Sequence, residues 1–398
     1  MKHLYIHIPF CHRRCAYCDF NTYANMEDRI EAYVQALCSE LRMLAAEPPP
    51  PAPISPEAAA LPPTIFFGGG TPTMLALDQF ERVLNAAHAL VPLEGAEISS
   101  EANPGTVLGR DYLRGLRSLG VNRLSMGVQS LHDPTLRILG RIHTADEAYR
   151  SYVEAREAGF ANINLDFIFG LPGQELAQWE ATLNAVTAWG VDHFALYSLI
   201  LEESTPLYAQ VTSGRMQVPD DEATGAMYEA ALGHFAAAGY MQYEISNWAY
   251  EQAEGSRQQA EVRFPQFACR HNIAYWLNSD YLAAGAGAHG HVFPRRYYDI
   301  LGIDEYIRAV NEGRRPVAET TPLTPADLAA ETMMMGMRLN IGVGEAHFAA
   351  RCGRPLDEVY GEAISELVDQ GLVERVAGRV RLTPRGRMFG NRVFARFL

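Results

Sequence analysis

The stretch IPFCHRRCAYC, residues 8–18, decides the fold, and it places Cys11, Cys15 and Cys18 within eight residues. Three thiolates at this spacing lie on one tight loop and can converge on a single small object. The loop follows directly on the apolar run Leu4–Ile8. Because the carboxyl ends of strands are where barrel folds build their active sites, we expect a functional metal centre here.

Two kinds of metal centre fit three clustered thiolates. Structural zinc normally takes four protein ligands, often as two separated pairs, and this chain has no second C-x-x-C pair, although His12 is available. A cubane iron–sulfur cluster held by three cysteines leaves one iron open to a cofactor or substrate. The residues alone favour a [4Fe-4S] cluster, with zinc or an accidental group of cysteines as alternatives. Cys38, Cys269 and Cys352 are expected to be small buried hydrophobic residues.

The first 240 residues alternate short apolar runs with helical patterns. Repeated strand–helix units form right-handed crossovers and a parallel sheet, so six units predict an α/β fold. We expect an open (β/α)6 partial TIM-type barrel, with a doubly wound sheet as the alternative. The predicted strands are Leu4–Ile8, Thr64–Phe67, Glu97–Glu101, Arg123–Val128, Asn162–Phe169 and His193–Ile200. The predicted helices are Asp28–Ala46, Leu77–Leu90, Tyr112–Ser118, Ala145–Ala158, Gln174–Ala188 and Glu222–Ala238.

The rest of the chain divides into less regular parts. Residues 47–63, rich in Pro and Ala, are expected to form an exposed, partly extended insertion without a regular helix, and residues 251–266 a polar loop. The helical patterns Thr324–Arg338 and Leu356–Gln370, followed by a short hairpin at 372–374 and 379–382, resemble a winged-helix module. We therefore predict a barrel over 1–240, a connecting region over 241–320 and a mainly helical, winged-helix-like C-terminal domain over 321–398.

Composition excludes several classes of protein. The chain has 398 residues, 48% of them hydrophobic, which excludes a wholly disordered chain. Its net charge of −14 argues against nucleic-acid binding, so the C-terminal domain is expected to pack against or cover the site. No apolar run reaches the roughly 20 residues that span a bilayer. The first residues lead straight into a strand, so we expect no signal peptide, no transmembrane segment and a cytoplasmic location.

The C-x3-C-x2-C triplet after a first strand resembles the signature of radical S-adenosylmethionine proteins. Within them, the wider pattern is similar to the oxygen-independent coproporphyrinogen III oxidase family, over nearly the whole chain. The supporting segments are YIHIPF at 5–10, GGGTPT at 68–73, GVQ at 127–129 and DFIFGLPG at 166–173. Taken singly, each of them reads as a turn, a cap or a strand end.

This resemblance implies two cofactors. A [4Fe-4S] cluster would bind Cys11, Cys15 and Cys18, and S-adenosylmethionine would chelate the open iron through its amino and carboxylate groups. The glycine segment would hold the amino group, and Arg141 would lie near the carboxylate. The implied S-adenosylmethionine contacts are Tyr5, Gly69, Gly70, Thr71, Glu101, Gln129, Arg141 and Asp166. The segment Asn103-Pro104-Gly105 reads only as a turn.

Three features resemble the haem-chaperone branch of that family more than its oxidases. The oxidases carry a fourth cysteine where this chain has Phe20, and an extension before the first strand where this chain has four residues ahead of Tyr5. Residues 271–276, HNIAYW, match the H-N-x-x-Y-W motif of the chaperone branch.

The branch implies haem binding at this motif, through His271, Asn272, Tyr275 and Trp276. A neutral imidazole of His271 suits haem iron, and a helix would place Tyr275 on the same face. Trp276 offers a flat apolar surface to a macrocycle. His289 or His291 would supply the second ligand. From the residues alone, a histidine with satisfied hydrogen bonds beside a core aromatic pair is the more common arrangement.

We therefore expect a haem chaperone that carries a [4Fe-4S] cluster and S-adenosylmethionine. Its partners would be haem, an electron donor and haem-accepting proteins, respiratory ones among them. Two alternative functions are enzymatic: the oxidative decarboxylation of coproporphyrinogen III to protoporphyrinogen IX, and another radical S-adenosylmethionine reaction. The sequence leaves open whether the chain turns over a substrate.

Overall fold

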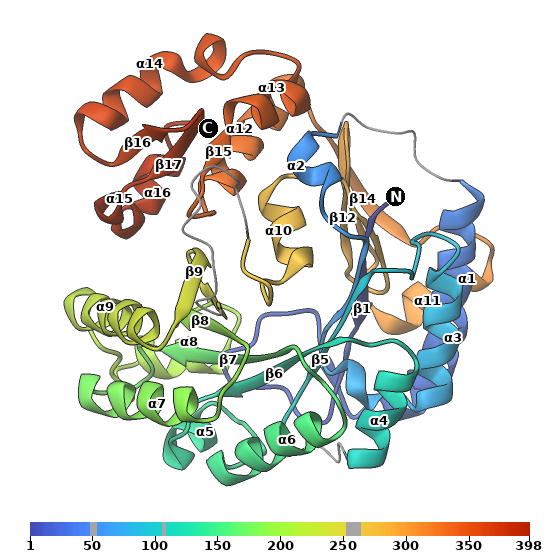
Figure 1. Cartoon of the computed structure of the whole chain (residues 1–398). Helices are drawn as coiled ribbons and strands as arrows, with labels where there is room; N and C mark the ends of the chain where they lie inside the picture. The colour runs from blue at the N-terminus through green and yellow to red at the C-terminus, as the bar shows by residue number, and fades with distance from the viewer. Residues whose placement is uncertain (48–53, 106–108, 252–263) are drawn as a thin grey trace.

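A nine-stranded sheet, curved into an open barrel, forms the larger part of the molecule (Figure 1). The computed structural model describes residues 1–47, 54–105, 109–251 and 264–398. Six neighbouring strands run parallel in chain order and confirm the six predicted from the sequence. They are β1 (His3–Ile8), β4 (Thr64–Gly69), β5 (Glu97–Ala102), β6 (Arg123–Gln129), β7 (Ile163–Phe169) and β8 (His193–Ser198).

Helices cover the outer face of this sheet, as Figure 1 shows. Successive strand residues point to opposite faces, so Leu4 and Ile6 of β1 are fully buried against the helices while Tyr5 and His7 face the barrel interior. The predicted helices are confirmed to within a few residues at each end. They are η1 (Glu27–Arg29) with α1 (Ile30–Ala46), α3 (Leu77–Ala87), α4 (Arg110–Ser118), α6 (Ala145–Glu157), α7 (Leu176–Ala188) and α9 (Asp221–Ala237).

Short elements from the middle of the chain complete the sheet at both edges. The strands β9 (Tyr240–Glu244) and β10 (Asn247–Tyr250) extend it antiparallel beyond β8, and β11 (Leu282–Ala284) pairs parallel with β1. The short helix α10 (Arg270–Trp276) stands inside the arc of the barrel (Figure 1). The remaining short elements are β2 (Phe10–Cys11), β3 (Tyr23–Ala24), η2 (Pro72–Met74), α5 (Asp133–Ile138), α8 (Pro206–Thr212), β12 (His289–Val292), β13 (Arg295–Asp299), α11 (Ile303–Asn311) and β14 (Val317–Pro322).

The insertion 47–63 differs from its expected form. Residues 48–53 lie outside the described residues, but the helix α2 (Pro56–Ala59) follows them, and Ser55, Ala58 and Leu61 are buried. The expectation of an exposed segment without a helix is therefore wrong for this part. Ser55 caps α2 by accepting a hydrogen bond from the Ala58 amide. Pro56 stands in the first turn, where a backbone N–H has no partner within the helix, so proline costs no hydrogen bond there. Residues 252–263 of the predicted polar loop also lie outside the described residues.

A separate core holds the C-terminal part of the chain together. It joins α12 (Pro325–Gly336), α13 (Glu345–Cys352), α14 (Leu356–Asp369) and a small sheet in the order β15 (Val343–Gly344), β17 (Arg379–Leu382), β16 (Val373–Val376), followed by α15 (Pro384–Met388) and α16 (Gly390–Phe394). The predicted helices and hairpin are confirmed. A buried ion pair between Arg351 of α13 and Asp280 ties this part to the barrel. No helix in the described ranges is long and apolar enough to cross a membrane.

Candidate functional site

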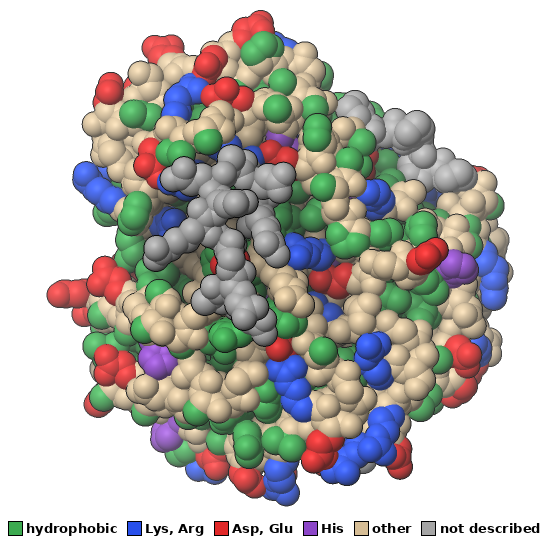
Figure 2. Space-filling model, viewed as in Figure 1, with side chains coloured by type: hydrophobic (Ala, Val, Ile, Leu, Met, Phe, Trp, Pro, Cys, Tyr) green, Lys and Arg blue, Asp and Glu red, His purple; other side chains and the backbone are tan. Residues whose placement is uncertain are grey.

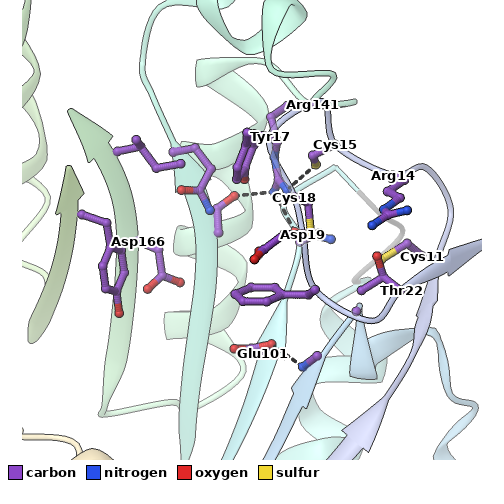
Figure 3. A pocket seen from close by; sticks show the side chains of 18 of the residues that line it. Cys11, Arg14, Cys15, Tyr17, Cys18, Asp19, Thr22, Glu101, Arg141 and Asp166 are labelled. Carbon is purple, nitrogen blue, oxygen red and sulfur yellow. Dashed lines mark hydrogen bonds between the residues drawn. The ribbon is translucent and has the colours of Figure 1, made fainter. Parts of the chain in front are cut away.

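A cavity of about 450 Å³ opens at the carboxyl ends of the parallel strands (Figure 3). The structure brings most of the predicted site residues together around it: Cys11, Cys15, Cys18, Gly69, Gly70, Glu101, Gln129, Arg141 and Asp166. Two predicted S-adenosylmethionine contacts lie outside the lining. Thr71 is buried, and the Tyr5 hydroxyl is hydrogen-bonded to His7 Nδ1 at 2.9 Å.

The cysteine loop is anchored by backbone pairing at several points. Phe10 and Cys11 pair with Tyr23 and Ala24 at its base, and the Ala16 amide donates to the Leu139 carbonyl at 2.9 Å. The Cys18 amide donates to the Cys15 carbonyl, which closes a tight turn. Burial raises the pKa of the Cys11 thiol to about 11. The loop therefore presents three partly buried sulfurs on the wall of one cavity.

The surroundings of the three thiols suit a cubane cluster, which takes three cysteine thiolates and keeps one iron open. Hydrogen-bond donors already face two sulfurs: Arg141 Nη1 lies 3.4 Å from Cys15 Sγ, and the Thr71 hydroxyl 3.8 Å from Cys11 Sγ. Donors of this kind suit negatively charged sulfur.

Two half-buried carboxyl groups, those of Glu101 and Asp166, form the opposite wall, as Figure 3 shows. Burial, together with the charge of Asp166, raises the pKa of Glu101 to about 7. Burial also raises the pKa of Asp166, although Asn164 and Ser125 donate hydrogen bonds to it. Glu101 is the last but one residue of β5, whereas Asp166 stands in the middle of β7. Both carboxyl groups can accept hydrogen bonds from hydroxyl groups or balance a cationic ligand.

Gly69 is required at its position in this wall. Its φ of +109° is strained for other residues, and a side chain there would overlap the imidazole ring of His7. The conformation directs the Gly69 amide to Glu101 Oε2 at 2.9 Å. The glycine segment thus holds one of the two carboxyl groups in place.

Asn103 is a site residue that the sequence reading missed. The sequence predicts only a turn at this position, yet Asn103 lines the cavity and forms hydrogen bonds with both Thr71 and Arg141. Its partners lie on other strands and loops, so no local pattern in the sequence could have revealed this role.

The HNIAYW segment forms α10, and its histidine is an internal residue. Glu97 accepts from the Arg270 and His271 amides at the start of the helix. The His271 ring is 1% exposed, with Nδ1 2.7 Å from Thr64 Oγ1 and Nε2 2.9 Å from the Tyr275 hydroxyl. Both ring nitrogens are therefore engaged in this conformation.

The other members of the predicted haem site differ in accessibility. Asn272, Tyr275 and Trp276 are half-buried, and Arg338 lies over the Trp276 ring at 4.7 Å. Of the two candidate second ligands, His291 is buried, whereas His289 is exposed and stacks on Tyr298. His289 is therefore the candidate that an external ligand reaches without rearrangement.

The open barrel, the cysteine loop and the cavity at the strand ends define the class of radical S-adenosylmethionine proteins. The model of the Radical SAM superfamily matches residues 5–186, and that of the HemN C-terminal domain matches residues 323–389. Similar proteins include "Heme chaperone HemW" of Bacillus subtilis (strain 168), 36% identical over 100% of this chain and 99% of the relative. "Heme chaperone HemW" of Escherichia coli (strain K12) is 33% identical over 99% and 97%. The chain belongs to the HemW family of radical S-adenosylmethionine proteins.

A solved structure shows the same fold. The coproporphyrinogen III oxidase HemN from Escherichia coli superimposes with a TM-score of 0.79 at 22% identity, over 99% of this chain and 89% of that one. At this identity the likeness concerns the fold alone. Membership of the superfamily implies a [4Fe-4S] cluster and S-adenosylmethionine as cofactors.

Proposed function

We propose that this protein is a haem chaperone: it binds haem and transfers it to acceptor proteins, and it carries a [4Fe-4S] cluster and S-adenosylmethionine. One observation carries the proposal, namely the full-length similarity to curated relatives named heme chaperones. The HNIAYW segment, folded as α10 inside the barrel, and the absence of a cysteine at Phe20 support it. The predicted domain boundaries at 240 and 320 are part of this proposal.

In this proposal, the chain's own residues bind and orient the cofactors. Cys11, Cys15 and Cys18 would hold three irons, and Arg141 would pair with the carboxylate of S-adenosylmethionine. Glu101, Gln129 and Asp166 would accept hydrogen bonds from its polar groups. When bound, the cluster supplies one electron at a potential that the protein tunes. The near-neutral pKa of Glu101 means that a cationic ligand beside it would favour its ionised form.

Haem would meet α10 through its histidine. Burial holds the pKa of His271 well below its usual range, so the ring stays neutral, as an iron ligand must be. His271 Nε2 is hydrogen-bonded to the Tyr275 hydroxyl, so this bond must break before the nitrogen can bind haem iron. We propose the replacement of the Tyr275 hydroxyl by haem iron as the binding step. Trp276 would flank the macrocycle, and His289 would be the second ligand because it is exposed.

Haem affinity of the cluster-loaded chain tests the proposal. A stable hemin complex is expected, and His271→Ala should weaken it by at least about tenfold, which corresponds to about 1.4 kcal/mol. The measurement is a hemin titration followed by visible absorption, with His88→Ala, an exposed histidine after α3, as the matched control. Equal hemin affinity in the wild type and in His271→Ala would exclude His271 as a haem ligand.

The same preparation decides between chaperone and oxidase. Supplied with coproporphyrinogen III, a reductant and S-adenosylmethionine, it should form no protoporphyrinogen IX, whereas an apo-acceptor should gain haem from the hemin complex. Catalytic turnover of coproporphyrinogen III would reject the chaperone assignment in favour of the oxidase.

A further inference from the structure

Asn103 connects the two side chains that donate toward the cysteine sulfurs. The Thr71 hydroxyl lies 3.8 Å from Cys11 Sγ, and Arg141 Nη1 lies 3.4 Å from Cys15 Sγ. Asn103 Nδ2 is 2.7 Å from Thr71 Oγ1, and Asn103 Oδ1 is 2.6 Å from Arg141 Nη2. One amide therefore bridges donors that arrive from two separate loops and face two different sulfurs.

The chemistry of the partners determines where each proton lies. A guanidinium has only donors, so the Asn103 oxygen must face Arg141 and the amide nitrogen must face Thr71. The Thr71 oxygen then accepts from Asn103, and its single proton is left for Cys11 Sγ. Arg141 also donates to the Gly127 carbonyl, which fixes its plane against β6. The network thus delivers one donor to each of two sulfurs.

We propose that Asn103 is a positioning residue for the iron–sulfur cluster and that it raises the cluster's reduction potential. This inference rests on the proposed ligation by Cys11, Cys15 and Cys18. Hydrogen bonds to ligating sulfurs and a nearby positive charge stabilise the reduced cluster, which carries one more negative charge than the oxidised one. Arg141 is half-buried in the cavity wall, so water screens its charge less than it would at the open surface. Asn103 acts through Thr71 and Arg141 by holding both donors toward sulfur.

The midpoint potential of the cluster in the full chain tests this role. The reconstituted protein is titrated without S-adenosylmethionine, and the reduced cluster is followed by electron paramagnetic resonance. In Asn103→Ala, we expect the ratio of reduced to oxidised cluster at a fixed potential to fall about tenfold, which equals about 59 mV for a one-electron couple. Asn122→Ala is the matched control, because the Asn122 amide also bridges two backbone groups, those of Ile98 and Ala96, but away from the cavity.

Two further variants separate positioning from simple packing. Asn103→Asp keeps the shape and the acceptor for Arg141, but it cannot donate to Thr71 and competes for the hydroxyl proton, so the potential should fall there as well. Thr71→Val removes the Cys11 donor alone and should give part of the Asn103→Ala effect. In the double variant Thr71→Val/Asn103→Ala, the midpoint potential should fall by less than the sum of the two single shifts, because both substitutions break the same chain of hydrogen bonds.

The outcomes distinguish this proposal from the proposed function. Full iron and sulfide content with a wild-type potential in Asn103→Ala or Asn103→Asp would overturn the role of Asn103 alone. If Asn103→Ala does not retain its cluster, the midpoint potentials of Asn103→Asp and Thr71→Val test the same role. A wild-type chain that assembles no cluster would overturn the ligation by the three cysteines, and this inference with it.

Discussion

A Cys15→Ser chain, reconstituted without oxygen, is expected to contain no cubane cluster, whereas the wild type should hold about four irons per chain. The serine hydroxyl is a harder and much less acidic ligand than a thiol, so it replaces thiolate poorly on iron. Cys15 also lies at the centre of the loop, with Arg141 donating toward its sulfur. Iron and sulfide analysis together with the visible absorption spectrum would measure the loss.

The chain offers its own controls for this experiment. Cys38 is buried in α1, outside the cavity, and Cys352 lies in α13, 3.6 Å from the Thr332 hydroxyl. Serine at either position should leave the iron content unchanged. A Cys15→Ser chain that assembles a cluster like that of the wild type would contradict the ligand assignment. Zinc in place of iron and sulfide in the wild type would contradict the cluster itself.

Removing the carboxyl group of Asp280 is expected to lower the free energy of unfolding by about 3–5 kcal/mol. Asp280 and Arg351 form an ion pair whose side chains are 8% and 4% exposed. Burial raises the pKa of Asp280 even though Arg351 opposes the shift, so desolvation outweighs the attraction. Asp280→Ala removes the carboxylate that Arg351 contacts in this buried place. Urea unfolding followed by circular dichroism would measure the change.

A double-mutant cycle tests that reason for the loss. If the penalty comes from burying the Arg351 charge without the Asp280 carboxylate beside it, Asp280→Ala/Arg351→Met should be more stable than Asp280→Ala, because methionine replaces the charge with apolar contacts. Glu366→Ala is the control, since its ion pair with Arg396 is about half exposed and should contribute less than about 1 kcal/mol. If the double variant loses as much free energy of unfolding as Asp280→Ala and Arg351→Met lose together as single variants, the explanation is contradicted.

The parts that sequence predicted well are those with a local physical signal. Most barrel strands contain a short apolar run, and the helices between them repeat apolar residues at helical spacing. The three cysteines lie within one loop, so their spacing alone indicates a shared metal centre. Most of the implied cofactor contacts stand at strand ends, and parallel strands bring those ends to one cavity.

Other features could not be seen because their partners are distant in sequence. The strand β11 has three residues and is held by pairing with β1 at the other end of the chain. The helix α2 is kept in place by a contact between Ser55 and His347, at 2.6 Å, and by an ion pair between Glu57 and Arg379. Neither element carries enough local pattern to be predicted.

The sequence by itself determined the alternation of strands and helices, the cysteine loop and the position of the site at the strand ends, because hydrophobic patterns and motif spacing are properties of neighbouring residues. The choice between an open barrel and a doubly wound sheet was decided by the tertiary structure alone. Only the tertiary structure decided that Asn103 bridges Thr71 and Arg141, and that both nitrogens of His271 are engaged. A hydrogen bond forms only when folding brings donor and acceptor to about 3 Å, within a few tenths of an ångström. That precision is absent from the order of residues along the chain.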